Sequence, residues 1–180
     1  MKLLLDIGNS RIKVATLDGQ GLQVHTALAS TNCHVLAEFV ATLGPGVTLC
    51  MASSVAANDY NKAIEQALAP LPVRWAKTSH SVAGVANAYP DPSQLGVDRW
   101  VAMLGLTRHF AGEHPPLVLA NFGTATTIDT LSPHNRFEGG LILPGITMMH
   151  ESLARGTANL PNERGAIQAF PTTTISAISS

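Results

Sequence analysis

The opening of the chain, residues 2–14, has the pattern of a β-hairpin whose functional groups gather at the bend. An apolar run, Leu3–Leu5, leads into a polar turn at Gly8, after which an alternating strand begins. Glycine can adopt the positive φ that lets backbone N–H groups converge on an anion. The segment also offers four side-chain donors: Asn9, Ser10, Arg11 and Lys13. We therefore expect this turn to bind phosphate.

Asp6 stands beside these donors, at the end of the predicted first strand. A lone carboxylate repels phosphate unless a cation such as Mg²⁺ lies between the two. The expected ligand is therefore a metal-bound nucleotide and not a bare anion.

A related pattern occurs at residues 117–131, where a hydrophobic strand, a turn at Gly123-Thr124 and an alternating strand follow one another. Two such turns, each at the start of one half of the chain, predict a duplicated architecture with two lobes facing each other across a nucleotide cleft. The alternative is an ordinary Asn/Gly hairpin used twice. The occurrence of the pair favours the functional interpretation.

Composition narrows the class of protein. With 180 residues, 46% hydrophobic and 13% charged, the chain can bury a substantial core in one large or two small domains. The formal net charge of -1 and the absence of a Lys/Arg cluster argue against a nucleic-acid partner. No run of eighteen apolar residues is present, so we expect no membrane association and a cytoplasmic location. Cys33 and Cys50 lack metal-site spacing, which predicts neither a disulfide nor zinc.

Hydrophobic periodicity predicts an α/β protein. In the first half we expect the order β-β-β-α-β-α-β, with Thr31-Asn32 capping the first helix, a strand at 47–53 buried on both faces, and Asn58 capping the second helix. Residues 77–96 show little periodicity and are predicted to form a long functional loop before a helix at 97–110. The second half begins again as β-β-β-α, and residues 157–180 carry no predicted element.

Two common nucleotide-binding motifs are missing. The chain has no G-x-x-x-x-G-K-[ST] sequence, and Gly19-Gln20-Gly21 lacks the third glycine and the following helix of a dinucleotide-binding turn. Phosphate binding by hairpin turns remains, and in this respect the first hairpin resembles that of the actin-like superfamily of kinases and ATPases. This resemblance predicts two actin-like (ribonuclease H-like) lobes, each starting with a hairpin meander in a mixed sheet flanked by helices.

Four segments narrow the resemblance to type III pantothenate kinases. They are the Asp-x-Gly-Asn-Ser start at Asp6, the Tyr-x-x-Pro-x-x-Leu-Gly-x-Asp-Arg stretch from Tyr89, the Gly-Thr-Ala-x-Thr turn from Gly123, and the Gly-Gly-x-Ile-x-Pro-Gly stretch from Gly139. They occur in the family's order over nearly the whole chain. The resemblance implies ATP-dependent phosphorylation of pantothenate to 4′-phosphopantothenate, the first step of coenzyme A biosynthesis.

The resemblance assigns catalysis to Asp98, as the base that accepts the hydroxyl proton of the substrate. An alternative for Asp98 is a simple partner for the helix dipole, because it lies at the predicted start of a helix. The other substrate-binding residues implied are Tyr89, Gly96, Val97, Arg99 and Thr174, with Asp98 itself among them. Arg99 offers a fork of donors for a carboxylate or a phosphate.

The resemblance also assigns the nucleotide site, with ATP and Mg²⁺ as cofactors. The implied phosphate-binding residues are Asp6, Ile7, Gly8, Asn9, Ser10, Arg11, Ile12, Lys13, Gly123 and Thr124, and Asp6 would meet Mg²⁺ through the nucleotide. A monovalent cation, K⁺ or NH₄⁺, is implied near the second turn. Members commonly have Asp where this chain has Asn121, so the loss of that charge predicts weaker cation binding. Asp129 is retained and is expected to stabilise the second hairpin or approach the metal.

The expected organisation is an N-terminal lobe at 1–112, with a substrate loop at 77–99, and a C-terminal lobe at 113–180 that is shortened relative to the family. Family members are homodimers, and we carry that expectation over. The substitution at Asn121 and the short second lobe leave open a second function, a non-catalytic regulator related to transcription. A kinase of the same superfamily acting on another small alcohol is a third.

Overall fold

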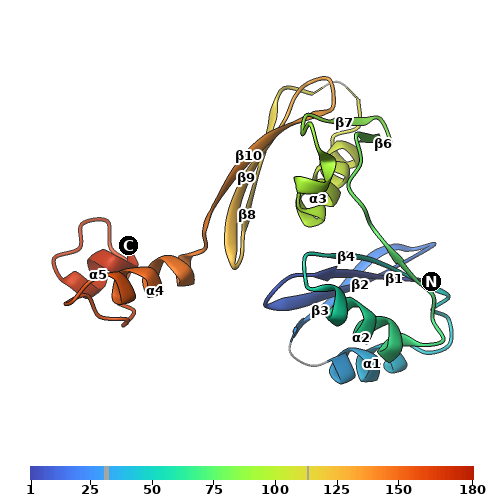
Figure 1. Ribbon diagram of the computed structural model, residues 1–180, viewed down its shortest axis with the longest axis horizontal. Helices are drawn as coiled ribbons and strands as arrows, with labels where there is room; N and C mark the ends of the chain where they lie inside the picture. The colour runs from blue at the N-terminus through green and yellow to red at the C-terminus, as the bar shows by residue number, and fades with distance from the viewer. Residues whose placement is uncertain (31–32, 113) are drawn as a thin grey trace. The chain divides into compact units, whose positions relative to one another are not determined.

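The computed structural model describes residues 1–30, 33–112 and 114–180, so the predicted cap at Thr31-Asn32 lies outside the described residues. The chain divides into two compact units (Figure 1). The first unit contains Met1–Leu117 and Leu131–Gly139, and the second contains Val118–Thr130 and Gly140–Ser180. The lobe boundary predicted at residues 112 and 113 remains a proposal.

The first sheet has the strand order β3-β2-β1-β4-β5. Its strands are β1 (Lys2–Ile7), β2 (Arg11–Asp18), β3 (Gly21–Ala29), β4 (Leu49–Ser54) and β5 (Val73–Trp75), and its helices are α1 (Cys33–Thr42) and α2 (Asn58–Leu68). Strand β1 runs antiparallel to β2 and parallel to β4. The predicted order of elements in the first half is confirmed.

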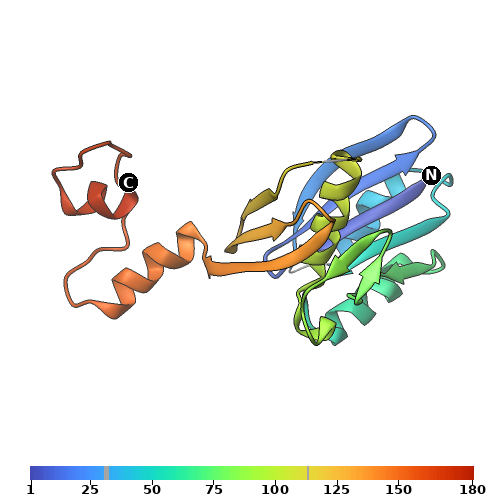
Figure 2. The same cartoon turned by 90° about the horizontal axis from the view of Figure 1, so that it is seen from above.

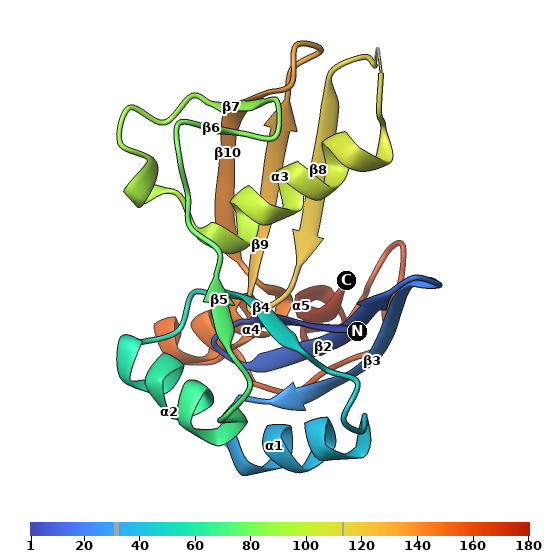
Figure 3. The same ribbon diagram turned by 90° about the vertical axis from the view of Figure 1, so that its right-hand side faces the viewer.

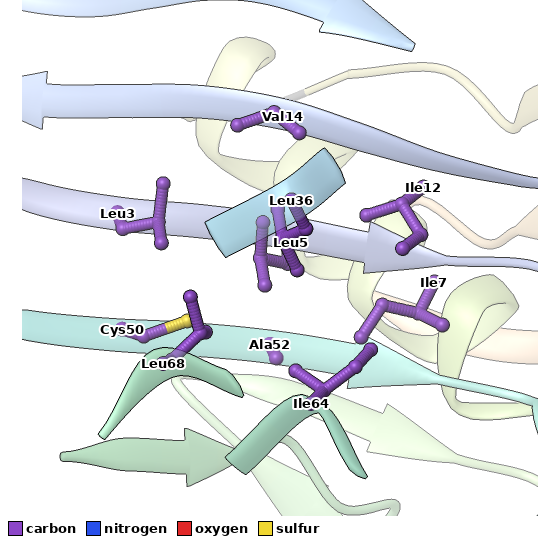
Figure 4. Close-up of a cluster of buried hydrophobic side chains, with 10 residues drawn as sticks. All are labelled: Leu3, Leu5, Ile7, Ile12, Val14, Leu36, Cys50, Ala52, Ile64 and Leu68. Atoms are coloured by element: carbon purple, nitrogen blue, oxygen red, sulfur yellow. The ribbon is translucent and has the colours of Figure 1, made fainter. Parts of the chain in front are cut away.

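Helices α1 and α2 lie on the same face of this sheet (Figure 3). The alternating pattern of β1 directs every second side chain to that face, where Leu3 and Ile7 are fully buried. Figure 4 shows the resulting core. It consists of Leu3, Leu5, Ile7, Ile12, Val14, Leu36, Cys50, Ala52, Ile64 and Leu68.

Two local predictions for this sheet are wrong. Strand β4 was expected to be buried on both faces, but Met51 is 45% exposed, although Cys50, Ala52 and Ser53 are buried. Asn58 was expected to cap α2, but it is the first helical residue. Ala57 occupies the cap position and makes no side-chain capping bond.

The second sheet has the order β6-β7-β10-β9-β8. Its strands are β6 (Ser81–Val82), β7 (Val85–Asn87), β8 (Leu117–Phe122), β9 (Ala125–Leu131) and β10 (Arg136–Pro144). The predicted hairpin of β8 and β9 is confirmed. Strands β6 and β7 were not predicted, because they are too short to alternate visibly; Ala83 and Gly84 join them with φ of 51° and 81°.

The remaining elements are η1 (Pro92–Gln94), α3 (Val97–His109), α4 (Ile146–Gly156) and α5 (Thr174–Ser179). Figure 2 shows α4, the irregular segment after it and α5 at the end of the chain. Helix α5 was not predicted, although Thr173 caps it by accepting a bond from the N–H of Ser176. The α/β class with two mixed sheets flanked by helices is as predicted. Among the described residues, no helix is both long and apolar enough to cross a membrane.

The core makes a prediction about thiol chemistry. Burial raises the pKa of the Cys50 thiol to about 12, so near pH 8 it carries almost no reactive thiolate. We expect Cys50 in the native protein to react with Ellman's reagent on the order of 1,000-fold more slowly than in denaturant. Cys33, which is partly exposed, provides the internal comparison. Equal labelling rates at the two cysteines, assigned by mass spectrometry, would contradict this packing.

Candidate functional site

The first turn joins β1 to β2 through Gly8, Asn9 and Ser10. The N–H of Gly8 donates to the carbonyl of Arg11 at 2.9 Å, within the hairpin itself. Gly8 does not use the positive φ that a glycine allows, since it is not among the glycines with left-handed backbone. Ser30, at the end of β3, donates from its hydroxyl to the Asn9 carbonyl at 2.7 Å and from its N–H to the Ser10 carbonyl at 3.2 Å. The turn is thus fixed by β3 while the side chains of Asn9 and Arg11 stay exposed.

Asp6 lies level with Lys13 on β2 and with Ser53 on β4. Lys13 Nζ donates to one carboxylate oxygen of Asp6 at 2.9 Å, and Ser53 Oγ donates to the other at 3.1 Å. The side chains of Lys13 and Asp6 are 62% and 41% exposed, so the ion pair adds little to stability. The bonds from Lys13 and Ser53 hold the Asp6 carboxylate beside the turn. Sequence reasoning missed Ser53, because only the parallel pairing of β1 with β4 brings it here.

The residues of this site fit a hydrated Mg²⁺ ion whose ligands include a carboxylate and the phosphate groups of a nucleotide. The accessible carboxylate of Asp6 is an oxygen ligand of the kind that Mg²⁺ prefers, and Mg²⁺ commonly takes one or two carboxylates together with substrate phosphates. Within the described ranges no three His, Cys, Asp or Glu side chains group into a metal site. Ile7 and Ile12 point into the core, so any contact of theirs with phosphate would be through the backbone.

The second turn, Gly123-Thr124, joins β8 to β9 and repeats the first in one respect. The N–H of Gly123 donates across the turn to the carbonyl of Ala125 at 3.0 Å, as Gly8 does to Arg11. The start of α4 lies directly against this turn, because the N–H of Gly145 donates to the carbonyl of Thr124 at 3.0 Å. A Cβ at Gly145 would meet the backbone oxygens of that turn. Steric exclusion of a side chain therefore explains the last glycine of the Gly-Gly-x-Ile-x-Pro-Gly stretch.

Asp129 lies in the same unit and is 1% exposed. The backbone of Gly140 passes so close that a Cβ there would clash with a carboxylate oxygen of Asp129. The second glycine of the stretch thereby gives this buried carboxylate its room. Asn121, at the end of β8, is exposed.

Tyr89, Arg99 and Phe137 form one cluster in the first unit. The rings of Tyr89 and Phe137 stack with centroids 5.9 Å apart and planes 10° from parallel. The guanidinium carbon of Arg99 lies 5.6 Å from the centroid of Phe137, and Nη1 of Arg99 donates to the hydroxyl oxygen of Tyr89 at 3.3 Å. The structure therefore brings together two of the predicted substrate residues. Phe137 was not predicted.

Asp98 occupies the first turn of α3, as predicted. One carboxylate oxygen accepts the N–H of Arg99 at 2.8 Å, so the carboxylate is folded back over the start of the helix. A Cβ at Gly96 would lie 2.7 Å from that oxygen, which explains a glycine two residues earlier. Val97 is the first residue of α3 and is half-buried. This geometry agrees with both roles of Asp98. One carboxylate oxygen meets the N–H of Arg99 at the start of the helix, as a partner of the helix dipole does, and the other oxygen takes no part in that bond.

Hydrogen bonds of Asp91 and Asn87 and the buried side chain of Leu95 hold the loop before α3 in place. The N–H and hydroxyl of Ser93 donate to Asp91 at 2.9 and 2.7 Å and lower the pKa of that exposed carboxyl. Leu95, the residue that follows η1, is buried. Asn87, which sequence reasoning also missed, accepts the N–H of Tyr89 at 3.0 Å and donates to the carbonyl of Ser79 at 3.2 Å.

Thr174 is exposed at the first position of α5, in the second unit. Helix α5 is tied to its surroundings through Ser179, whose hydroxyl lies 3.3 Å from Nε2 of the buried His150 on α4 and accepts the N–H of Gly165 at 2.7 Å. These bonds fix the helix that carries Thr174. The role predicted for Thr174 stays a prediction.

Comparison with known proteins agrees with the motifs. A family model described as type III pantothenate kinase matches residues 2–180. A type III pantothenate kinase from Bordetella petrii is 47% identical over 184 residues, covering 100% of this chain and 69% of that protein. One from Laribacter hongkongensis is 41% identical, covering 99% of this chain and 72% of that protein.

A solved structure from Campylobacter jejuni, described as a conserved putative Baf family transcriptional activator, has the same fold. Its TM-score is 0.56 at 22% sequence identity, and the match covers 98% of this chain and 71% of that one. At this identity the likeness supports the fold alone.

The contact between Gly145 and the second turn makes a prediction. Gly145→Ala forces a methyl group onto the carbonyls of Gly123 and Thr124, and overpacking of this kind typically costs about 1–3 kcal/mol. We expect the urea midpoint of unfolding, measured by circular dichroism, to be lower than in the unmodified chain. Gly156→Ala, where a Cβ meets nothing within 4 Å, is the matched control and should leave the midpoint unchanged or higher. Equal midpoints for the two variants would show that the turn does not resist the methyl group.

Proposed function

The chain belongs to the type III pantothenate kinase family, and from that premise we propose that it transfers the γ-phosphoryl group of ATP to the hydroxyl group of pantothenate. The products are ADP and 4′-phosphopantothenate, and the reaction opens coenzyme A biosynthesis. In balanced form, the new bond joins the substrate oxygen to the γ-phosphorus, the bond from the γ-phosphorus to the bridging oxygen breaks, and the hydroxyl proton leaves to a base.

The base in this proposal is Asp98. Its first carboxylate oxygen is engaged by the N–H of Arg99, which orients the group at the start of α3. The second oxygen accepts the proton and aims the substrate oxygen at phosphorus. Positioning of this kind supplies much of the catalysis in phosphoryl transfer, because little covalent chemistry falls to the protein.

The observation that carries the substrate assignment is the cluster of Arg99 and Tyr89 on Phe137, adjacent in sequence to Asp98. Arg99 provides a planar donor group for the carboxylate of pantothenate, and Tyr89 adds a hydroxyl beside it. Gly96, Val97 and Thr174 complete the proposed substrate site. This chemistry suits a small acid that also bears an alcohol.

The nucleotide in the proposal is held by the two turns. Residues 6–13 and the pair Gly123-Thr124 contact its phosphates, with Lys13 and Arg11 offering positive charge. Mg²⁺, when bound, neutralises the charge that develops on the phosphate oxygens, and Asp6 would hold it through the nucleotide. A monovalent cation near Asn121 belongs to the same proposal, as do the cytoplasmic location, the homodimer, the absence of nucleic-acid and membrane partners, and the lobes at 1–112 and 113–180.

The assignment of the base is tested by Asp98→Asn. We expect the turnover of pantothenate with ATP to fall about 10²–10⁴-fold, the usual contribution of a general base, while the fold is kept. Asp91→Asn is the matched control, because this exposed carboxylate on the same segment bonds only Ser93 in the contacts above. Wild-type turnover in Asp98→Asn would remove the base assignment. Inactivity of the unmodified chain, with nucleotide binding retained, would favour the regulatory alternative.

The role of Asn121 makes a separate prediction. Asn121→Asp adds a negative charge at the end of β8, so K⁺ should stimulate turnover more strongly than it does in the unmodified chain. The measurement is the rate of pantothenate phosphorylation over a KCl titration, with sodium chloride holding the ionic strength constant. Asn121→Ser is the neutral control. An identical K⁺ response in Asn121→Asp and Asn121→Ser would place the cation elsewhere.

A further inference from the structure

We propose that Phe137 is a positioning residue for substrate binding. Its ring holds the Arg99 guanidinium and the Tyr89 ring in the arrangement that receives the substrate carboxylate. This inference rests on the proposed function, and it adds to it a residue that the family motifs above leave undefined. Phe137 is fully buried, so it acts through its two neighbours and not by touching pantothenate.

Each of the three side chains contacts the other two. The Tyr89 ring lies nearly parallel to the Phe137 ring, the Arg99 guanidinium lies within cation-π range of it, and Arg99 donates to Tyr89. They come from three separate segments: the loop before η1, the first turn of α3 and strand β10. Moving the ring therefore changes both neighbours at once.

The backbone fixes where the ring stands. Phe137 on β10 pairs with Asn87 on β7, and its carbonyl accepts the N–H of Ala88 at 3.0 Å. The same Asn87 accepts the N–H of Tyr89 through its side chain. The ring and the Tyr89 backbone are thus set by one short stretch of parallel pairing.

The ring of Phe137 matters because it restricts the guanidinium of Arg99. Arg99 is only 5% exposed, and its long side chain has several rotatable bonds whose freedom must be lost before it can receive a carboxylate. An aromatic face attracts the cation and restricts it in advance, whereas an aliphatic side chain fills the space without that attraction. Loss of the ring should therefore weaken carboxylate binding much more than it changes the chemical step at Asp98.

The first test is Phe137→Leu in the full chain. We expect the KM for pantothenate to rise about 10-fold, with the KM for ATP and kcat within about 2-fold of the unmodified values. Leu131→Val, at an equally buried position of the first unit, is the control and should move none of the three constants. An unchanged pantothenate KM, or a parallel loss in all constants, overturns the proposal. If Phe137→Leu does not fold, Phe137→Met fills a similar volume without a ring.

A double-mutant cycle asks whether the effect passes through Arg99. In the presence of Arg99→Leu, adding Phe137→Leu should raise the pantothenate KM by a smaller factor than it does in the unmodified chain, because the cation that the ring positions is already gone and only Tyr89 remains to be displaced. Independent, multiplicative effects of the two substitutions would show that Phe137 does not act through Arg99.

A readout without substrate separates this inference from the proposed function. The NMR signal of the Arg99 side-chain N–H, assigned by its absence in Arg99→Lys, should be shifted by the Phe137 ring and should move toward its ordinary position in Phe137→Leu. If the unmodified chain fails to phosphorylate pantothenate, the proposed function falls while this shift still decides the positioning. A signal that does not move refutes the positioning whatever the substrate.

Discussion

The buried guanidinium of Arg99 is the constraint on which the proposed substrate site depends. An arginine is always charged, and burying it is costly unless hydrogen bonds and polarisable neighbours compensate. Tyr89 and Phe137, which belong to segments far apart in the sequence, contribute to this compensation. These contacts tie the loop before α3 to strand β10. They also fix the start of α3, where Asp98 stands next in the chain.

Close backbone approach is the second organising device. Gly96 leaves room for the carboxylate of Asp98, Gly140 for that of Asp129, and Gly145 for the carbonyls of the second turn. In each case the glycine is needed because another functional group fills the space that a side chain would take. The motifs therefore describe packing around the reactive groups as much as the groups themselves.

The sequence predicted the elements whose patterns are long enough to read. Both hairpins, the order of the first half and helix α3 follow from alternation and helical spacing. Strands β6 and β7 escaped because they are only two and three residues long. Ser53 and Phe137 escaped for another reason: their importance arises from strand register between distant segments, which no local pattern reveals. The hairpin at Gly8 closes through the N–H of Gly8, and it does so without the left-handed backbone that a glycine allows.

In the proposed reaction, the carboxylate of Asp98 accepts the proton of the pantothenate hydroxyl while its oxygen receives the γ-phosphoryl group of ATP. The most direct measurement is transfer of label from γ-³²P-ATP to pantothenate by the unmodified chain, with the product identified by chromatography. We expect labelled phosphopantothenate whose formation requires both substrates and Mg²⁺. Nucleotide binding without any transfer of label to pantothenate would contradict it.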